Sequence, residues 1–148
     1  MDEIEIAAKI GDPEAQLKLG LRYLKEKNFE KAFEYFSKGS QKDHAECQLQ
    51  LGNLYEFGIG VAQDIQKAFE LYTKSAKKND AAQLKLGHMY FHGVHVNQDY
   101  NKAKNWFSKA SKQSNMEALT MLGAIAQYGY CEEEDLSGAI EMFKFAAE

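Results

Sequence analysis

One short pattern recurs about four times along the 148 residues, and this repetition limits the possible folds more than any other feature. Its clearest marker is a Leu-Gly pair, which recurs at Gly20, Gly52, Gly87 and Gly123. A small residue stands five positions before each glycine, and a tyrosine stands three positions after the first three. Residues spaced in this way share one face of a helix, so we expect each copy to begin with an amphipathic helix.

A second amphipathic helix is predicted in each copy, because apolar and small residues recur there every three to four positions. The aligned segments are 31–36, 67–72, 102–107 and 138–143. An Asp or Asn stands three residues before each segment and is expected to cap the helix: Asn28, Asp64, Asp99 and Asp135. We expect the aromatic residues of these helices to be core, namely Tyr35, Phe36, Tyr72, Trp106, Phe107 and Phe143. Trp106→Ala should therefore cost about 3–5 kcal/mol.

Paired helices of this kind must stack, because one hairpin cannot bury both of its apolar faces. The aligned glycines remove side-chain bulk where the two helices of a pair cross, so the helices can approach closely. The predicted fold class is all-α, a right-handed α/α superhelical solenoid of about four helix-turn-helix repeats. We expect one domain over residues 1–148, with a partial repeat as an N-terminal capping helix and four full repeats: 1–11, then 12–43, 44–79, 80–115 and 116–148.

The pattern Leu-Gly-x-x-Tyr-x-x-Gly-x-Gly-Val-x-x-Asp-x-x-Lys-Ala, complete in residues 51–68, resembles the Sel-one-like repeat (SLR). That family is a longer-looped relative of the tetratricopeptide repeat. The match covers about residues 12–148, and the fourth copy departs from it at Ala126, Cys131 and Gly138. The resemblance implies a non-catalytic scaffold or adaptor that binds a protein or peptide.

In tetratricopeptide-like stacks the first helix of each repeat lines the concave face. The resemblance therefore implies partner-binding residues at equivalent positions of this chain: Asn53, Glu56, Phe57, His88, Phe91, His92, Gln127 and Tyr128. Glu14, Glu46 and Glu117, six positions before their glycines, belong to the same set. Aromatic anchors in such a groove would supply most of the affinity. The competing interpretation is that several residues in this region, notably Leu21, Leu24 and Phe57, pack against the neighbouring hairpin.

A metal site is the alternative that the histidines suggest. His88 and His92 are four residues apart and would share a helix face, and His95 follows in the loop, so three imidazoles could hold Zn²⁺. A metal-dependent hydrolase using His88 and His92 is therefore a competing function. The Glu of a His-Glu-x-x-His motif is absent, however, and all three histidines fall at variable repeat positions, so we predict no cofactor.

Charge and hydropathy restrict the partners. The net charge is −4 and Arg22 is the only arginine, which argues against nucleic-acid binding. The acidic N-terminus and the lack of an 18-residue apolar run predict no signal peptide and no membrane span, hence a cytoplasmic protein. Cys47 and Cys131 lie in no paired-cysteine motif and are expected to be packing or loop residues.

Three further hypotheses concern partners. Related repeats recur in bacterial toxin-neutralising and secretion-associated binding proteins, which is an alternative function. The chain stops at Glu148 directly after the last predicted helix, so we expect either a piece of a longer protein or an end that docks on a partner or on a second copy through that uncapped helix. Lysines near the helix ends could form a rim that selects acidic partners: Lys18, Lys25, Lys38, Lys42, Lys74, Lys77, Lys78, Lys109 and Lys112.

Overall fold

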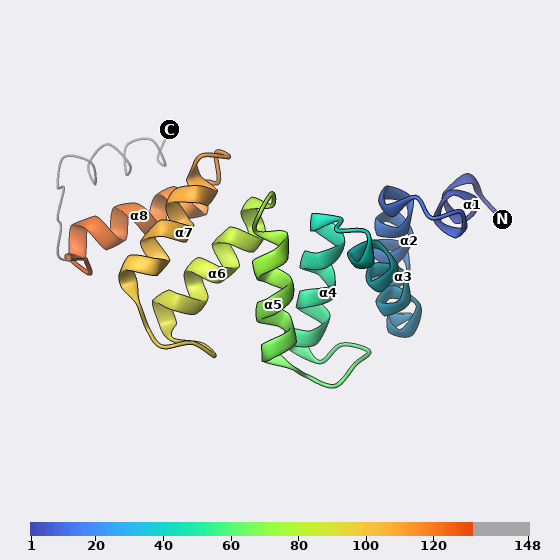
Figure 1. Ribbon diagram of the computed structural model, residues 1–148, viewed down its shortest axis with the longest axis horizontal. Helices are drawn as coiled ribbons and strands as arrows, with labels where there is room; N and C mark the ends of the chain where they lie inside the picture. The colour runs from blue at the N-terminus through green and yellow to red at the C-terminus, as the bar shows by residue number, and fades with distance from the viewer. Residues whose placement is uncertain (132–148) are drawn as a thin grey trace. The chain divides into compact units, whose positions relative to one another are not determined.

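A computed structural model describes residues 1–131 of the chain (Figure 1). Within these residues it contains eight α-helices and no β-strand, so the all-α prediction is confirmed. The helices are α1 (Glu3–Lys9), α2 (Pro13–Lys25), α3 (Phe29–Gln41), α4 (Ala45–Phe57), α5 (Ile65–Ser75), α6 (Asp80–His92), α7 (Tyr100–Ser111) and α8 (Met116–Tyr128). None of these helices is long and apolar enough to span a membrane. The last predicted helix, with Asp135 and Phe143, lies outside the described residues, and so does the docking predicted for it.

Two compact units make up the chain, Met1–Lys78 and Asn79–Glu148. In the first unit, α2 and α3 form one hairpin and α4 and α5 form another. The short α1 packs against α2, α3 packs against α4, and α2 also touches α4. In the second unit, α6 and α7 form a hairpin and α8 packs against α7. We call the first helix of each repeat helix A (α2, α4, α6, α8) and the second helix B (α3, α5, α7).

Side-chain caps fix where the helices begin. The predicted caps of the B helices are confirmed, because Asn28, Asp64 and Asp99 each accept a hydrogen bond from the backbone N–H three residues later. Side chains also cap the A helices, each by accepting from a backbone N–H two or three residues later, at positions that the sequence analysis did not identify: Asp12, His44, Asn79 and Asn115. All four stand eight residues before an aligned glycine, so the repeat alignment contained this signal.

Three of the aligned glycines, Gly20, Gly52 and Gly87, lie where helices A and B cross, as predicted. A Cβ built on Gly87 would lie 2.5 Å from the nearest ring carbon of Phe107. The same close approach joins Gly52 to the Tyr72 ring, at 2.7 Å. Real Cβ atoms essentially never come this close to a ring, so a side chain at either glycine would push the helices apart.

The aromatic residues of the B helices are not all core, which corrects one prediction. Phe36, Tyr72 and Phe107 are fully buried, and Tyr35 is nearly so. Trp106 is only half-buried, and the Lys109 ammonium lies 4.4 Å from the centre of its ring. The placement of Trp106 in the core is therefore wrong, because the neighbouring Phe107 occupies the position that faces helix A.

Candidate functional site

Two of the predicted binding residues on α4 make hydrogen bonds to a core tyrosine. The Tyr72 hydroxyl donates to Asn53 Oδ1 at 2.7 Å and also contacts Glu56 Oε2. Because Tyr72 is fully buried, its hydroxyl needs an acceptor inside the protein. Burial raises the pKa of Tyr72 well above its usual range, and the hydrogen bond to Glu56 raises it further. Asn53 and Glu56 therefore have a structural role, whatever else they contact.

Phe57 has a different environment from these two residues. It is the last residue of α4, directly before Gly58, whose left-handed backbone ends the helix. Phe57 is 60% exposed, so most of its surface faces solvent. Leu24, by contrast, is half-buried and packs against the hydrophobic core of the first unit. We call Asn53, Glu56 and Phe57 the α4 surface.

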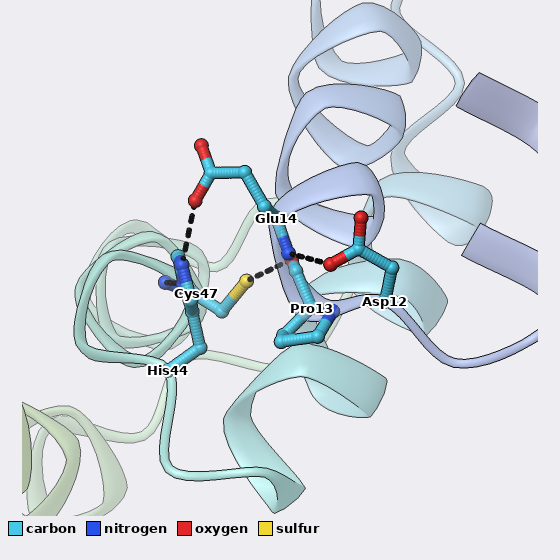
Figure 2. A network of polar contacts seen from close by, with 5 residues as sticks. All are labelled: Asp12, Pro13, Glu14, His44 and Cys47. Carbon is cyan, nitrogen blue, oxygen red and sulfur yellow. Dashed lines mark hydrogen bonds and ion pairs between the residues drawn. The ribbon is translucent and has the colours of Figure 1, made fainter. Parts of the chain in front are cut away.

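A polar network joins the starts of α2 and α4 (Figure 2). His44 Nδ1 accepts a hydrogen bond from the Cys47 backbone N–H at 3.3 Å, which leaves Nε2 to donate to Glu14 Oε2 at 3.0 Å. Asp12 caps α2 by accepting from the Glu14 N–H at 3.2 Å. Glu14, which the resemblance placed among the partner-binding residues, therefore links two helices of its own unit.

Cys47 is buried at the centre of this network. Its thiol lies 3.8 Å from the Pro13 carbonyl oxygen (Figure 2). Burial raises the pKa of the Cys47 thiol to about 12, with smaller contributions from nearby glutamates. Because only a thiolate is a good nucleophile or metal ligand, Cys47 is a packing residue, as the sequence analysis expected.

In the second unit, His88 and His92 lie side by side on α6. Their rings are stacked, with centroids 6.0 Å apart and planes 6° from parallel. His88 also packs edge-on against Phe107, and its Nε2 lies 3.1 Å from Glu117 Oε1 on α8. His95 is an exposed loop residue with a left-handed backbone, φ 66°. Among residues 1–131, no three His, Cys, Asp or Glu side chains are grouped closely enough to hold a metal ion.

An aromatic cluster extends the predicted residues of the second unit. The Phe91 ring packs edge-on against the rings of Tyr100 and Tyr130, with centroid distances of 5.2 Å and 5.4 Å. Tyr128, which is 67% exposed, lies 6.1 Å from Tyr130. Gln127 is exposed as well. Sequence reasoning missed Tyr100 and Tyr130, because one begins α7 and the other follows α8, outside the positions that the repeat alignment compares.

The α8 surface is our name for His88, Phe91, His92, Gln127 and Tyr128 together with Tyr100 and Tyr130. It presents aromatic rings, imidazoles and an amide. Such groups suit contacts with peptide groups and apolar side chains, because large rigid rings bury area at a small cost in conformational entropy.

Comparison with known proteins gives a consistent result. The sequence profile of the Sel1 repeat matches residues 13–44, 45–80, 81–115 and 117–148, within one residue of the repeats expected from sequence. A Sel1 repeat protein from Oxalobacter formigenes shares the fold, with a TM-score of 0.87 over 93% of this chain at 24% identity. A second structure is c5321, described as a protective antigen of uropathogenic Escherichia coli with an SLR fold. It gives a TM-score of 0.89 over 97% of the chain at 29% identity.

This chain is shorter than both similar structures, since it spans 58% of the first and 32% of the second. No curated protein sequence matches the chain significantly.

Proposed function

Because the chain belongs to the Sel1 repeat family, whose members are generally protein-interaction scaffolds, we propose that it is a non-catalytic scaffold for a protein or peptide partner. The partner would contact the A helices, which in such repeats line the concave face. Each unit contributes its own surface to this proposal, the α4 surface in the first and the α8 surface in the second.

One observation carries the proposal. Large aromatic side chains stand exposed at the last residue of two A helices, Phe57 on α4 and Tyr128 on α8. Both occupy the fifth position after an aligned glycine. A folded protein gains nothing from leaving such rings in water, whereas a partner that covers them gains apolar burial of about 25 cal/mol per Å². Aromatic residues are also the commonest binding hot spots.

Polar residues beside these rings support a peptide or protein partner. On the α8 surface, the stacked His88 and His92 and the exposed Gln127 offer hydrogen-bonding groups next to aromatic faces. This combination of apolar anchors with a polar rim is typical of protein interfaces. In this proposal Asn53 and Glu56 support the site without having to contact the partner. Their hydrogen bonds to Tyr72 hold α4, which carries Phe57, against α5.

Capture of partners on immobilised protein, followed by mass spectrometry, tests the proposal. We expect Phe57→Ala and Tyr128→Ala each to lose at least one partner that the unchanged chain retains. Both rings are exposed, so neither change should shift the unfolding midpoint much. Ile10→Ala is the matched control, because Ile10 is an apolar side chain, 82% exposed, on neither surface. If both aromatic variants retained every partner that the control retains, the proposal would be wrong.

A further inference from the structure

Three lysines of the first unit surround a pocket between the start of α4 and the end of α5. The pocket has a volume of about 310 Å³ and is lined by Asp43, Ala45, Gln48, Lys74, Lys77 and Lys78. We call it the lysine pocket. Its volume is at the small end of the range for ligand sites, so it admits one side chain or a small anion. With three ammonium groups and one carboxylate, its lining is positive in a chain of net charge −4.

Buried polar contacts hold the walls of this pocket. The Ser75 hydroxyl donates to the Ala45 carbonyl at 2.6 Å, which fixes the end of α5 against the start of α4. Ser75 is fully buried. Gln48, only 3% exposed, directs its amide Nε2 to Asp43 Oδ1 at 3.5 Å, the upper limit for a hydrogen bond. The pocket is therefore a fixed feature of the helix packing.

The lysines that correspond to Lys74 in other repeats have partners within the chain. In the first repeat, Lys38 donates to Glu34 Oε1 at 2.8 Å. In the third repeat, the Lys109 ammonium lies over the Trp106 ring. These contacts account for lysines at the ends of B helices without any external ligand.

In the second repeat neither kind of contact forms. Glu70, which corresponds to Glu34, accepts a hydrogen bond from Gln66 at 2.8 Å instead. Leu71 stands at the position that corresponds to Trp106, so Lys74 has no aromatic ring there to contact. Among the described residues, the ammonium groups of Lys74, Lys77 and Lys78 have no hydrogen bond, ion pair or ring contact.

The crevice that becomes this pocket is bridged in the other two repeats by the residue corresponding to Lys78. In the first repeat this residue is Lys42, which donates to the carbonyl of Gly11. Gly11 corresponds to Asp43 of the second repeat. In the third repeat it is Gln113, which donates to Gln83 Oε1 at 3.3 Å. Gln83 corresponds to Gln48 of the second repeat. Among these three repeats, only the second lacks a bridge from this position, so its crevice is lined with unpaired lysines.

We propose that the lysine pocket binds an oxyanion, a carboxylate or phosphoryl group on an acidic side chain of the protein partner. The inference rests on the proposed scaffold function and adds the chemistry of the partner. Three lysines that line one small pocket attract an anionic group, and the buried Gln48 adds a neutral amide to the same lining. The pocket thus selects an acidic segment, while the aromatic surfaces supply apolar contact.

Fluorescence anisotropy with two labelled peptides tests this inference. One peptide is hexaglutamate, and the other replaces its third glutamate by phosphoserine, so that carboxylate and phosphoryl binding can be compared. The test variant is Lys74→Gln/Lys77→Gln/Lys78→Gln. The control is Lys9→Gln/Lys18→Gln/Lys25→Gln, which removes the same charge from exposed positions of the same unit, two of them also in the last turn of a helix.

We expect the unchanged chain to bind at least one peptide, and the pocket variant to bind it about tenfold more weakly, because each exposed charge pair changes an affinity only several-fold. The control should stay within about twofold of the unchanged chain, because none of its three lysines lines the pocket. Circular dichroism checks that both variants are folded. The inference is overturned if neither peptide binds, or if both variants weaken binding equally. Partner capture that depends on Phe57 and Tyr128 would survive that result, so the two proposals can fail separately.

Discussion

Phe107→Ala should be among the most destabilising single substitutions in the second unit. The Phe107 ring is fully buried in a cluster with Ala103, Leu122 and Ile125. Truncating such a ring costs about 3–5 kcal/mol, and the cost rises with the cavity that remains. Here one wall of the cavity is the α6 backbone at Gly87, which has no side chain to fill it. We therefore expect a value in the upper half of that range.

Trp106→Ala is the matched comparison, since it removes a larger ring from the adjacent residue. Trp106 is half-buried and gains a cation–π contact with Lys109, worth about 0.5–1 kcal/mol at an exposed site. Adding the loss of partial burial gives a total of about 1–2 kcal/mol. Equilibrium urea denaturation followed by far-UV circular dichroism suits both variants, because it does not depend on the single tryptophan.

Gly87→Ala provides a sharper test of the same contact. In the unchanged chain the new methyl group would collide with Phe107, which costs about 1–3 kcal/mol and outweighs the gain of about 1 kcal/mol from better helix propensity. In the Phe107→Ala background the ring is absent, so only the gain remains. The sign of the Gly87→Ala effect should therefore reverse between the two backgrounds. The same sign in both, or a Trp106→Ala cost equal to that of Phe107→Ala, would refute the packing described for this crossing.

Two further predictions concern caps and pH. Asp99→Ala should lower the free energy of unfolding by about 1 kcal/mol, because the Lys102 N–H loses its acceptor. Asp99→Asn keeps an acceptor oxygen and should retain most of the stability. Equal urea midpoints for the Ala variant and the unchanged chain would contradict the cap. The raised pKa of Cys47 means that the folded state keeps a proton that the unfolded state loses, so stability should fall between about pH 9 and 12, by up to about 1.4 kcal/mol per pH unit. Urea midpoints measured across that range should fall less steeply for Cys47→Ala, and parallel curves for the two proteins would show that the thiol contributes nothing.

The repeat alignment predicted most of the local structure. It gave the order of the A and B helices, the caps at Asn28, Asp64 and Asp99, and the crossing at the aligned glycines. It could also have identified His44 as a cap, because His44 stands where Asp12, Asn79 and Asn115 stand in the other copies. A histidine is an uncommon cap, so composition alone gave no reason to choose it.

The choice between Trp106 and Phe107 shows the limit of reasoning from residue type. Both are aromatic, and the helical period places both near the buried face. The position of Phe107 holds Phe36 and Tyr72 in earlier copies, whereas the position of Trp106 holds the aliphatic Leu71 in one of them. The size of tryptophan suggested burial, but the glycine opposite Phe107 determines which ring enters the crossing.

The sequence by itself determined that the chain forms paired helices and where each pair crosses, because those features follow from periodicity and residue size within about 35 neighbouring positions. The tertiary structure decided which polar side chains already have hydrogen-bond or ion-pair partners within the chain. Asn53 and Glu56 hold Tyr72, Glu14 pairs with His44, and the lysines at the end of α5 stay unpaired. Such pairings depend on side chains from different helices meeting at hydrogen-bond distance, and residue spacing along one helix contains no information about that distance.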